Sequence, residues 1–483
     1  MGVPKELSRA ALGLVEAWTT WRYFSKRDIS SGATGSGAFL SVALSHVRGP
    51  SCRQVVVTGL TRSVRDRLAL VRCLSRRRGA IVGVTVRRMT EADRDAAFRI
   101  YLDSYGGGPD MLPAMAELPL TDRWVGQDAG RVVGLMRELR VGQSFGGCFV
   151  PSSWVAAVGV GLTDRSRGVS RALMSGWLRD RHDAGVPLST LYMSTMAAYR
   201  PVGYELAGTR VSYQAPLEHL PREQPLAVEA WDEGDLADVS DCYHRVSLER
   251  NGMMDRPAWW WEPRVFGDVP ADAFLYRYRV IDEGRTTGYV VYTLKPDERA
   301  DFPIHWAPEP ECFALVAREL VWETEAAARS LLGFMAAQRT LGTDVYWNGP
   351  ANDPLLSFFP EHHPTLQGSY TWMMRLVHVS EALRLRGYPA GLDAEVRLRV
   401  VDLVVPGNDG AISLRVRHGH AEVEPASKAD LQVTVNGIAA LYSGWMSPYD
   451  ATRAGLLTGA TGEELATLAR LFQGTSPYLN EMF

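Results

Sequence analysis

The sequence predicts an α+β protein built from several domains, and three observations lead to this prediction. In residues 154–208, an apolar run, a basic turn with a glycine, a helical pattern and a second apolar run follow one another. A strand followed by an acid-capped helix occurs near residue 84 and again near residue 231. Residues 394–435 contain segments that alternate apolar and polar side chains with period two, which is typical of strands.

The size and composition of the chain limit what it can be. With 483 residues it is too long for a single core, and two to four domains are expected. The net charge of −3 gives no argument for nucleic-acid binding, and no apolar run is long enough to predict a membrane span. The cysteines lack metal-ligand spacing, so we expect reduced thiols in a cytoplasmic protein without a metal site: Cys52, Cys73, Cys148, Cys242 and Cys312.

Residues 1–83 form an atypical basic extension with poor hydrophobic periodicity. Three interpretations compete: a disordered basic arm, an Arg-rich targeting-like segment, or upstream DNA translated from a wrongly chosen start. We favour the third, because the residues from Val84 onward read as the beginning of a domain.

The first domain is expected to span residues 84–218. A short strand begins at Val84, and Thr90 is a good N-cap for the helix that follows. Two strand-like runs then flank the turn at Asp128–Gly130. This order leads into residues 154–208, the part of the chain that carries the clearest functional signal.

That part contains a turn suited to a phosphate group. The strand Val155–Leu162 is followed by the turn Thr163–Gly168, the helix Val169–Asp183 and the strand Leu188–Met193. A turn that opens a helix presents free backbone N–H groups and the positive end of the helix dipole. A pyrophosphate is the simplest ligand for this place, since three arginines add positive charge: Arg165, Arg167 and Arg171.

A second unit is expected over residues 226–379, after a proline-bearing linker at 216–225. Gly288–Leu294 is predicted as the strand before a crossover, and Thr324–Gln338 as the helix. The turn at Leu320–Glu325 has no glycine and carries acids, which would repel a pyrophosphate. We interpret this unit as a second copy of the first fold that has lost its cofactor site.

Residues 390–483 are expected to form a third, small α+β domain. Three period-two strands are separated by turn residues, and two helices follow at Asn436–Ser443 and Gly462–Phe472.

The turn resembles motif A of the GCN5-related N-acetyltransferases (GNAT), (Q/R)xxGx(G/A), here Arg165-Ser-Arg-Gly-Val-Ser170. From Val84 to Phe483 the layout resembles the Eis (enhanced intracellular survival) family. The resemblance is carried by residues 158–171, by Tyr199–Tyr204 and by the C-terminal phenylalanine. It implies tandem GNAT folds, each a mixed sheet with flanking helices, the second degenerate, and then a sterol-carrier-protein-like (SCP2-like) domain.

The resemblance also implies acetyl-CoA as the cosubstrate. The backbone of one strand would pair with the pantetheine, the turn would hold the pyrophosphate, and the end of the next strand would border the thioester. The residues implied in cofactor binding are Val158, Gly159, Val160, Ser166, Arg167, Gly168, Val169, Ser170, Arg171, Ser194 and Thr195.

Two catalytic groups are implied. Tyr199 would be the general acid that protonates the departing thiolate, and a phenol with a reference pKa of about 10 suits that role. The general base would be the α-carboxylate of Phe483, acting through water on the incoming ammonium group. The family's acceptors are amines such as aminoglycosides, and lysine-like or polyamine acceptors also fit. Candidate acidic contributors to the acceptor pocket are Asp103, Asp110, Glu117 and Glu481.

Other features have simpler interpretations. Met196-Ala-Ala replaces a glycine-rich loop and Pro201-Val202 replaces the more usual Arg-Phe, and both changes could reshape the acceptor pocket. The run Trp259–Trp261 is expected to pack between domains, and His362–His363 has no partner at metal-ligand spacing. The resemblance implies a homohexamer. Two alternative functions stay open, a lipid- or sterol-binding protein and a non-catalytic regulator that binds acetyl-CoA.

Overall fold

The computed structural model describes residues 83–108, 111, 118–267, 273–297 and 312–483. The basic extension lies outside the described residues, apart from Gly83 at its end. Asp110 and Glu117, two of the candidate acidic residues, also lie outside them.

The first domain begins with the expected strand and helix. A capping box formed by Thr90 and Asp93 starts the helical segment, and the predicted hairpin forms around the turn at Asp128–Gly130. Its second strand runs further than the apolar pattern suggested and folds back directly into the next strand. The elements are β1 (Thr85–Arg88), α3 (Arg94–Tyr105), β2 (Arg123–Asp128), β3 (Arg131–Phe145) and β4 (Cys148–Val160).

The second half of this domain follows the predicted strand–turn–helix–strand order. The helix has the predicted bounds, and it buries the apolar face that its 3.6-residue spacing creates, including Leu173 and Trp177. The elements are α5 (Val169–Asp183), β5 (Leu188–Tyr192), α6 (Met196–Tyr199) and β6 (Glu205–Pro216).

The second domain repeats this architecture, with one correction to the prediction. The strand that directly precedes the crossover helix is β11, not the run Gly288–Leu294, which lies in its antiparallel neighbour β10. The elements are β7 (Ala227–Ala230), α7 (Leu236–Leu248), β8 (Met254–Asp255), α8 (Ala258–Val265), β9 (Leu275–Asp282), β10 (Arg285–Pro296), β11 (Phe313–Trp322), α9 (Glu325–Ala336), β12 (Gly342–Gly349) and β13 (Thr365–Leu376).

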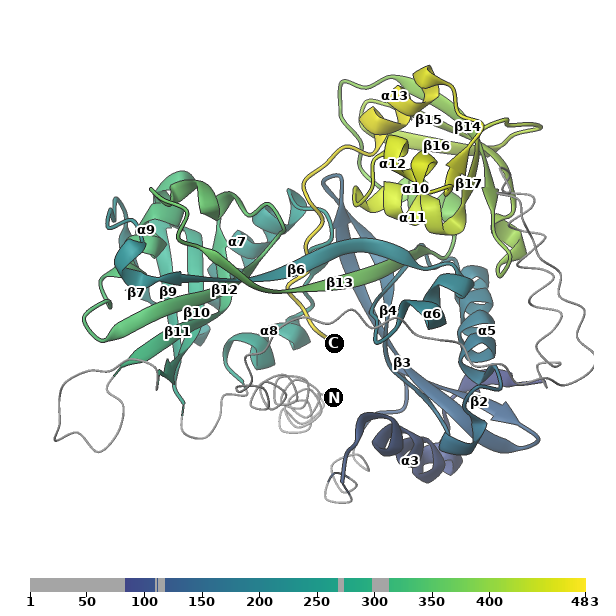
Figure 1. The fold of residues 1–483 in the computed structure, drawn as a ribbon, viewed down its shortest axis with the longest axis horizontal. Coiled ribbons are helices and arrows are strands. Elements are labelled where there is room, and N and C mark those ends of the chain that lie inside the picture. The colour runs from purple at the N-terminus through teal and green to yellow at the C-terminus, as the bar shows by residue number, and fades with distance from the viewer. Residues whose placement is uncertain (1–82, 109–110, 112–117, 268–272, 298–311) are drawn as a thin grey trace, which may run out of the picture. The chain divides into compact units, whose positions relative to one another are not determined.

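The two domains share strands, so their sheets form one continuous sheet. β13 inserts between β5 and β6, and the far half of β6 pairs with β12. Figure 1 shows β6 and β13 side by side as they pass from one domain into the other. In the described residues the strand order is β1-β2-β3-β4-β5-β13-β6-β12-β11-β10-β9-β7, with β8 paired to β3.

The third domain has its own sheet, covered by helices. Its sheet has the order β16-β15-β14-β17-β18. The three predicted strands and both predicted helices are present. The elements are α10 (Val379–Leu385), β14 (Ala394–Val401), β15 (Gly410–Arg417), β16 (His420–Pro425), β17 (Gln432–Thr434), α11 (Val435–Ser443), α12 (Pro448–Arg453), β18 (Leu457–Thr458) and α13 (Gly462–Leu471).

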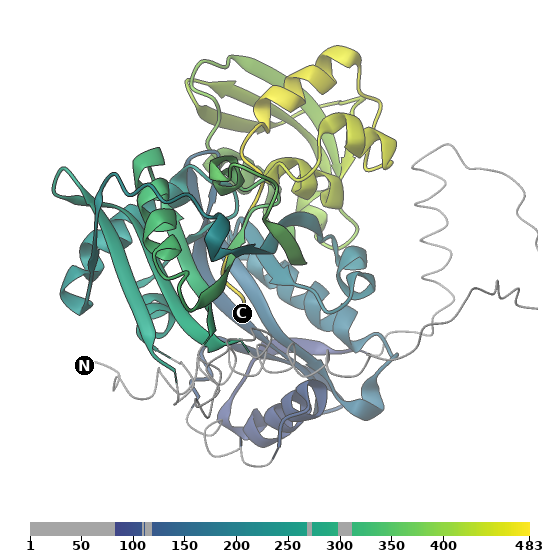
Figure 2. The ribbon, with the colours of Figure 1, turned by 60° about the vertical axis from the view of Figure 1, so that its left-hand side comes forward.

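After α13 the chain leaves the third domain as an extended C-terminal tail, residues 473–483. The tail runs past the β6–β13 pair and ends beside the first domain, as Figures 1 and 2 show. Thr209 on β6 pairs with Tyr478 in an isolated bridge, and the amide of Tyr478 donates to the carbonyl of Asn251 at 2.9 Å. The end of the chain is therefore held by both GNAT-like domains.

The remaining sequence features have structural explanations. Trp260 is buried in a cluster that joins residues of several domains, and Trp261 is buried in a cluster formed mainly by the second domain. Trp259 is 41% exposed, so the expected packing between domains holds for Trp260 but not for the whole run. The ring of His363 stacks on that of His219. Within the described ranges, no group of His, Cys, Asp and Glu side chains is arranged to hold a metal ion. No helix in those ranges is both long and apolar enough to cross a membrane.

Candidate active site

The first domain contains a pair of parallel strands that separate. β4 and β5 pair only from Ser152–Leu188 to Trp154–Thr190. Beyond Trp154, β4 continues to Val160, and no other described strand pairs with it on that side. A bulge at Ala157 (φ 52°) interrupts its pairing with β3. The backbone of Val158–Val160 therefore borders an opening in the sheet, which is where the sequence placed the pantetheine.

The turn at the start of α5 has the geometry of an anion site. Gly168 is the N-cap residue with φ 85°, and no side chain caps the helix. Ser166 also adopts a left-handed conformation, with φ 64°. The first N–H groups of α5, from Val169 to Arg171, thus lack an intrahelical partner and can bind a phosphate oxygen.

The arginines of this turn have different roles. Arg167 donates to Asp164 at 2.7 Å, and Asp164 also receives two hydrogen bonds from Arg131. These hydrogen bonds, with those from Arg131 the strongest, hold the pKa of Asp164 below its ordinary value. In the part of the chain that the structure describes, no ion pair engages Arg165 or Arg171. Arg167 therefore shapes the turn, and the other two arginines keep their charge for a ligand.

A second set of predicted residues follows β5. Ser194 and Thr195 are exposed, and the Thr195 hydroxyl caps the short helix α6 by accepting from the amide of Ala197 at 3.3 Å. Tyr199 ends this helix, and its side chain is only 7% exposed. Burial raises the pKa of Tyr199 to about 12. No described residue forms a hydrogen bond with its hydroxyl, which leaves this proton available to a ligand.

The C-terminal residue lies at the point where β4 and β5 separate. The ring of Phe483 stacks on Trp154 of β4, with centroids 4.3 Å apart, and meets Tyr192 of β5 edge-on at 5.7 Å. The Tyr192 hydroxyl also donates to the carbonyl of Leu479 at 2.9 Å. No described side chain forms an ion pair with the terminal carboxylate. The fold thus brings the last residue to the strands that also position Val158 and Tyr199.

One residue of this region was missed by the sequence analysis. Tyr105, at the end of α3, donates its hydroxyl to the carbonyl of Val158 at 3.3 Å. Burial raises the pKa of Tyr105, and the neighbouring Tyr199 raises it further. The Tyr105 hydroxyl thus contacts the strand that borders the opening, and Tyr199 lies near Tyr105. The signal that could have found Tyr105 is weak, because its partner lies 53 residues further along the chain.

The two candidate acidic residues that the structure describes, Asp103 and Glu481, lie in different environments. Asp103 is partly exposed on α3 and pairs with Arg99 at 3.1 Å. Glu481 is fully buried and pairs with Arg256 at 2.7 Å, so it is not available to an acceptor. The interpretation of Glu481 as a pocket acid is wrong, because a buried carboxylate needs its own cation.

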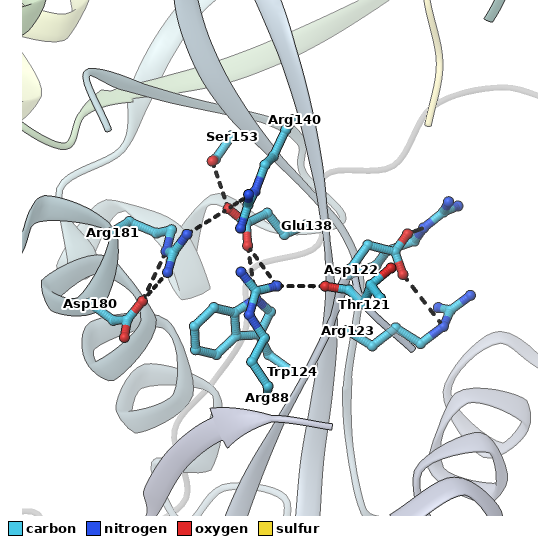
Figure 3. A network of polar contacts seen from close by, with 11 residues as sticks. Arg88, Thr121, Asp122, Arg123, Trp124, Glu138, Arg140, Ser153, Asp180 and Arg181 are labelled. Carbon is cyan, nitrogen blue, oxygen red and sulfur yellow. Dashed lines mark hydrogen bonds and ion pairs between the residues drawn. The ribbon is translucent and has the colours of Figure 1, made fainter. Parts of the chain in front are cut away.

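A buried polar network fixes α5 on the sheet, as Figure 3 shows. The Glu138 carboxylate, from β3, accepts from the indole of Trp124 at 2.9 Å and from Ser153 of β4 at 2.8 Å. It is also paired with three guanidinium groups: Arg88, Arg140 and Arg181. Since Arg181 belongs to α5 and Ser153 to β4, the network ties the helix that begins at the anion site to the strand that borders it.

The third domain holds the loop that follows Tyr199. The Asn436 side chain, on α11, donates to the carbonyls of Arg200 at 3.1 Å and Tyr204 at 2.8 Å. The buried Arg375 on β13 donates to the carbonyl of Val202 and forms an ion pair with Asp402 at 2.5 Å. The Tyr199 loop is thus fixed from outside its own domain.

Family models match all three parts of the chain. Acetyltransferase (GNAT) domain models match residues 85–207 and 252–376, and a sterol carrier protein domain model matches residues 379–480. The chain is a tandem GNAT acyltransferase. The tandem α+β organisation and the SCP2-like third domain expected from the Eis resemblance are confirmed.

Individual relatives agree with this assignment. The acyltransferase is 26% identical over 317 residues to an uncharacterised N-acetyltransferase of Streptomyces avermitilis, which covers 62% of this chain and 74% of the relative. The crystal structure of a GCN5-related N-acetyltransferase from Anabaena variabilis matches 83% of this chain and 100% of its own, with 26% identity and a TM-score of 0.75. A GCN5-related N-acetyltransferase from Kribbella flavida matches 83% of this chain and 98% of its own, with 27% identity and a TM-score of 0.67.

The tandem GNAT acyltransferase also shares its fold with Eis1 from Mycobacterium abscessus. That structure matches 83% of this chain and 100% of its own, with a TM-score of 0.68 and 24% identity. At this identity the likeness concerns the fold alone.

Proposed function

We propose that this chain transfers the acetyl group of acetyl-CoA to an amino group of a cationic acceptor such as an aminoglycoside. The observation that carries the proposal is the position of Phe483 where β4 and β5 separate. The backbone of Val158–Val160 also borders this opening, and Tyr199 ends the short helix that follows β5.

The residues present fit the cosubstrate. The uncapped N-terminus of α5 and the free Arg165 and Arg171 would hold the pyrophosphate of acetyl-CoA. The pantetheine would extend the sheet along Val158–Val160, since no described strand pairs with that edge of β4 there. Backbone N–H groups of β4 would polarise the thioester carbonyl.

The reaction would proceed by direct attack. The terminal carboxylate of Phe483, acting through water, takes a proton from the acceptor ammonium group. The neutral amine then attacks the thioester carbon, the carbon–sulfur bond breaks, and the new amide nitrogen releases its remaining surplus proton to water. The protonated carboxyl group of Phe483 also returns its proton to solvent. Tyr199 gives its proton to the departing thiolate and regains one from solvent. Among the described residues no cation is paired with the Phe483 carboxylate, which supports this role because the group can then meet a cationic acceptor.

The second GNAT domain would bind no acetyl-CoA. Glu323, at the corresponding turn, is paired with Arg245 and Arg285, and the Thr324 side chain caps the helix by accepting from the amide of Ala327. We also propose a cytoplasmic location and assembly as a homohexamer. Sedimentation of the full chain would test the number of subunits.

A thiol-release assay with acetyl-CoA and a panel of amines tests the proposal. Both Tyr199→Phe and a variant with one glycine added after Phe483 are expected to lower kcat by about 10²- to 10⁴-fold, because each removes or displaces a proton-transfer group. Tyr449→Phe is the control, since this tyrosine is exposed in the third domain. Equal rates in all variants would refute the roles of both groups. Tight binding of acetyl-CoA without turnover on any amine would favour the regulator.

A further inference from the structure

The second GNAT domain contains the same kind of strand opening as the first. β11 and β12 are parallel and pair only as far as Val316–Tyr346. Beyond that pair, residues 319–322 of β11 and residues 347–349 of β12 line a common cavity. In the first domain, the corresponding opening between β4 and β5 is the proposed pantetheine site.

The chain's own C-terminal tail lies at this second opening. The Tyr478 hydroxyl donates to the carbonyl of Asn348, on β12, at 3.0 Å. The Asn480 side chain donates to the carbonyl of Arg318, on β11, at 3.1 Å. Both tail residues line the cavity, and a space of only about 40 Å³ remains there. The tail thus bridges the two strands that separate.

A buried ion cluster adds to these hydrogen bonds. Arg256 is paired with Glu481 of the tail at 2.7 Å and with Glu319 of β11 at 3.0 Å, and all three side chains are at most 1% exposed. The Tyr243 hydroxyl donates to Glu481 at 3.2 Å. Buried charges depend strongly on their partners, so the cluster specifies where Glu481 lies.

The cluster is also fixed relative to the first domain. Arg256 directly follows β8, whose residue Asp255 pairs with Gly142 on β3. Glu481 stands two residues before Phe483, whose ring lies on Trp154. The ion pair between Arg256 and Glu481 therefore fixes the position of the terminal carboxylate relative to the first domain.

We propose that the second GNAT domain is a receptor for the chain's own C-terminus, with Arg256 and Glu481 as positioning residues for the carboxylate of Phe483. The strand opening that binds a cosubstrate in one domain binds a peptide segment of the same chain in the other. This inference rests on the proposed function for the role of the carboxylate, but not for the binding of the tail.

Glu481→Ala tests whether the second domain binds the C-terminal tail. It leaves no buried charge unpaired, since Arg256 retains its ion pair with Glu319. The first measurement is the release of Phe483 by a carboxypeptidase from the folded full-length chain. In Glu481→Ala we expect Phe483 to be released at least tenfold faster than in the wild type. We expect the same in Asn480→Ala, which loses the hydrogen bonds of its side chain to β11. Glu481→Gln keeps an acceptor oxygen for Arg256 and should restore most of the protection. Gln473→Ala, an exposed tail residue, is the matched control and should not change release.

The second measurement is thiol release by the same variants. We expect Glu481→Ala to lower kcat by about tenfold or more with an unchanged KM for acetyl-CoA, and Glu481→Gln to recover much of the rate. Protection of Phe483 in Glu481→Ala equal to that of the wild type would overturn the receptor. Fast release of Phe483 with unchanged turnover would support the receptor but overturn the catalytic role of the carboxylate, and with it the positioning role.

Discussion

Some residues of the candidate site could be predicted from sequence motifs, and others could not. Tyr199 and Phe483 were predicted from the Eis resemblance, and the fold places both beside the separating strands. Tyr105 was not predicted, because its contact with Val158 depends on how α3 packs on the sheet. Glu481 was predicted as a pocket acid, because no local pattern indicated that it would be buried with Arg256.

The burial of Tyr199 makes a prediction about pH. Since burial raises the pKa of Tyr199 to about 12, the hydroxyl stays protonated well above neutral pH. We expect kcat with saturating substrates to stay level from about pH 8 to about pH 10.5, whereas an ordinary tyrosine with a pKa of about 10 would begin to lose activity in this range. The test is the pH profile of kcat, and a decline centred near pH 10 that is absent from Tyr199→Phe would contradict it.

At the scale of elements, the two crossover helices begin differently, which supports the proposal that only the first domain binds a pyrophosphate. α5 begins at an uncapped Gly168, whereas α9 begins at Thr324, which satisfies its own helix. The bounds of α5 could be predicted, because its apolar spacing and the preceding glycine are local signals. The strand before α9 was misassigned because β10 and β11 are both apolar runs, and pairing between distant residues decides which one crosses over.

Gly168→Ala is predicted to weaken binding of CoA by about tenfold or more. At φ 85° an alanine is strained by roughly 1–2 kcal/mol, so the turn that would present the first N–H groups of α5 to a phosphate is expected to change its conformation. Gly185→Ala is the matched control, because Gly185 follows the other end of α5 with φ 73° and has open space around it. Calorimetric titration with CoA measures the effect. Equal affinity in the two variants would argue against an anion site at this turn.

On the scale of the whole molecule, the domains depend on contacts that no local pattern reveals. The continuous sheet exists because β13 lies between β5 and β6, which are more than 140 residues away in sequence. The number and class of domains could be predicted from repeated patterns. The shared strands could not, since an alternating strand does not specify its partner.

The ion pair between β13 and the third domain predicts a pH-dependent stability. Burial alone would raise the pKa of Asp402, but the charge and hydrogen bond of Arg375 outweigh it and hold this pKa below its ordinary value. Its contribution is therefore fully present above the unfolded-state pKa of about 4 and is lost as pH falls through the lower folded-state value.

We expect Asp402→Asn to destabilise the protein by about 3–5 kcal/mol at pH 7, because Arg375 is left buried without its anion. The difference from the wild type should shrink as pH falls below about 4. Urea midpoints at pH 7 and at about pH 3 provide the measurement. A difference that is the same at both pH values would show that the pair does not carry this stability.

The exchange of β6 and β13 has a consequence for biosynthesis. When β5 and β6 leave the ribosome, their partner strand does not yet exist, and residues 217–364 must be translated first. At 5–20 residues per second this takes about 7–30 s. During that time one edge of β5 and both edges of β6 lack their partner strands, and unpaired strand edges invite aggregation. Translation rate and chaperone supply should therefore limit the yield of active protein more strongly than they would for domains that close their own sheets.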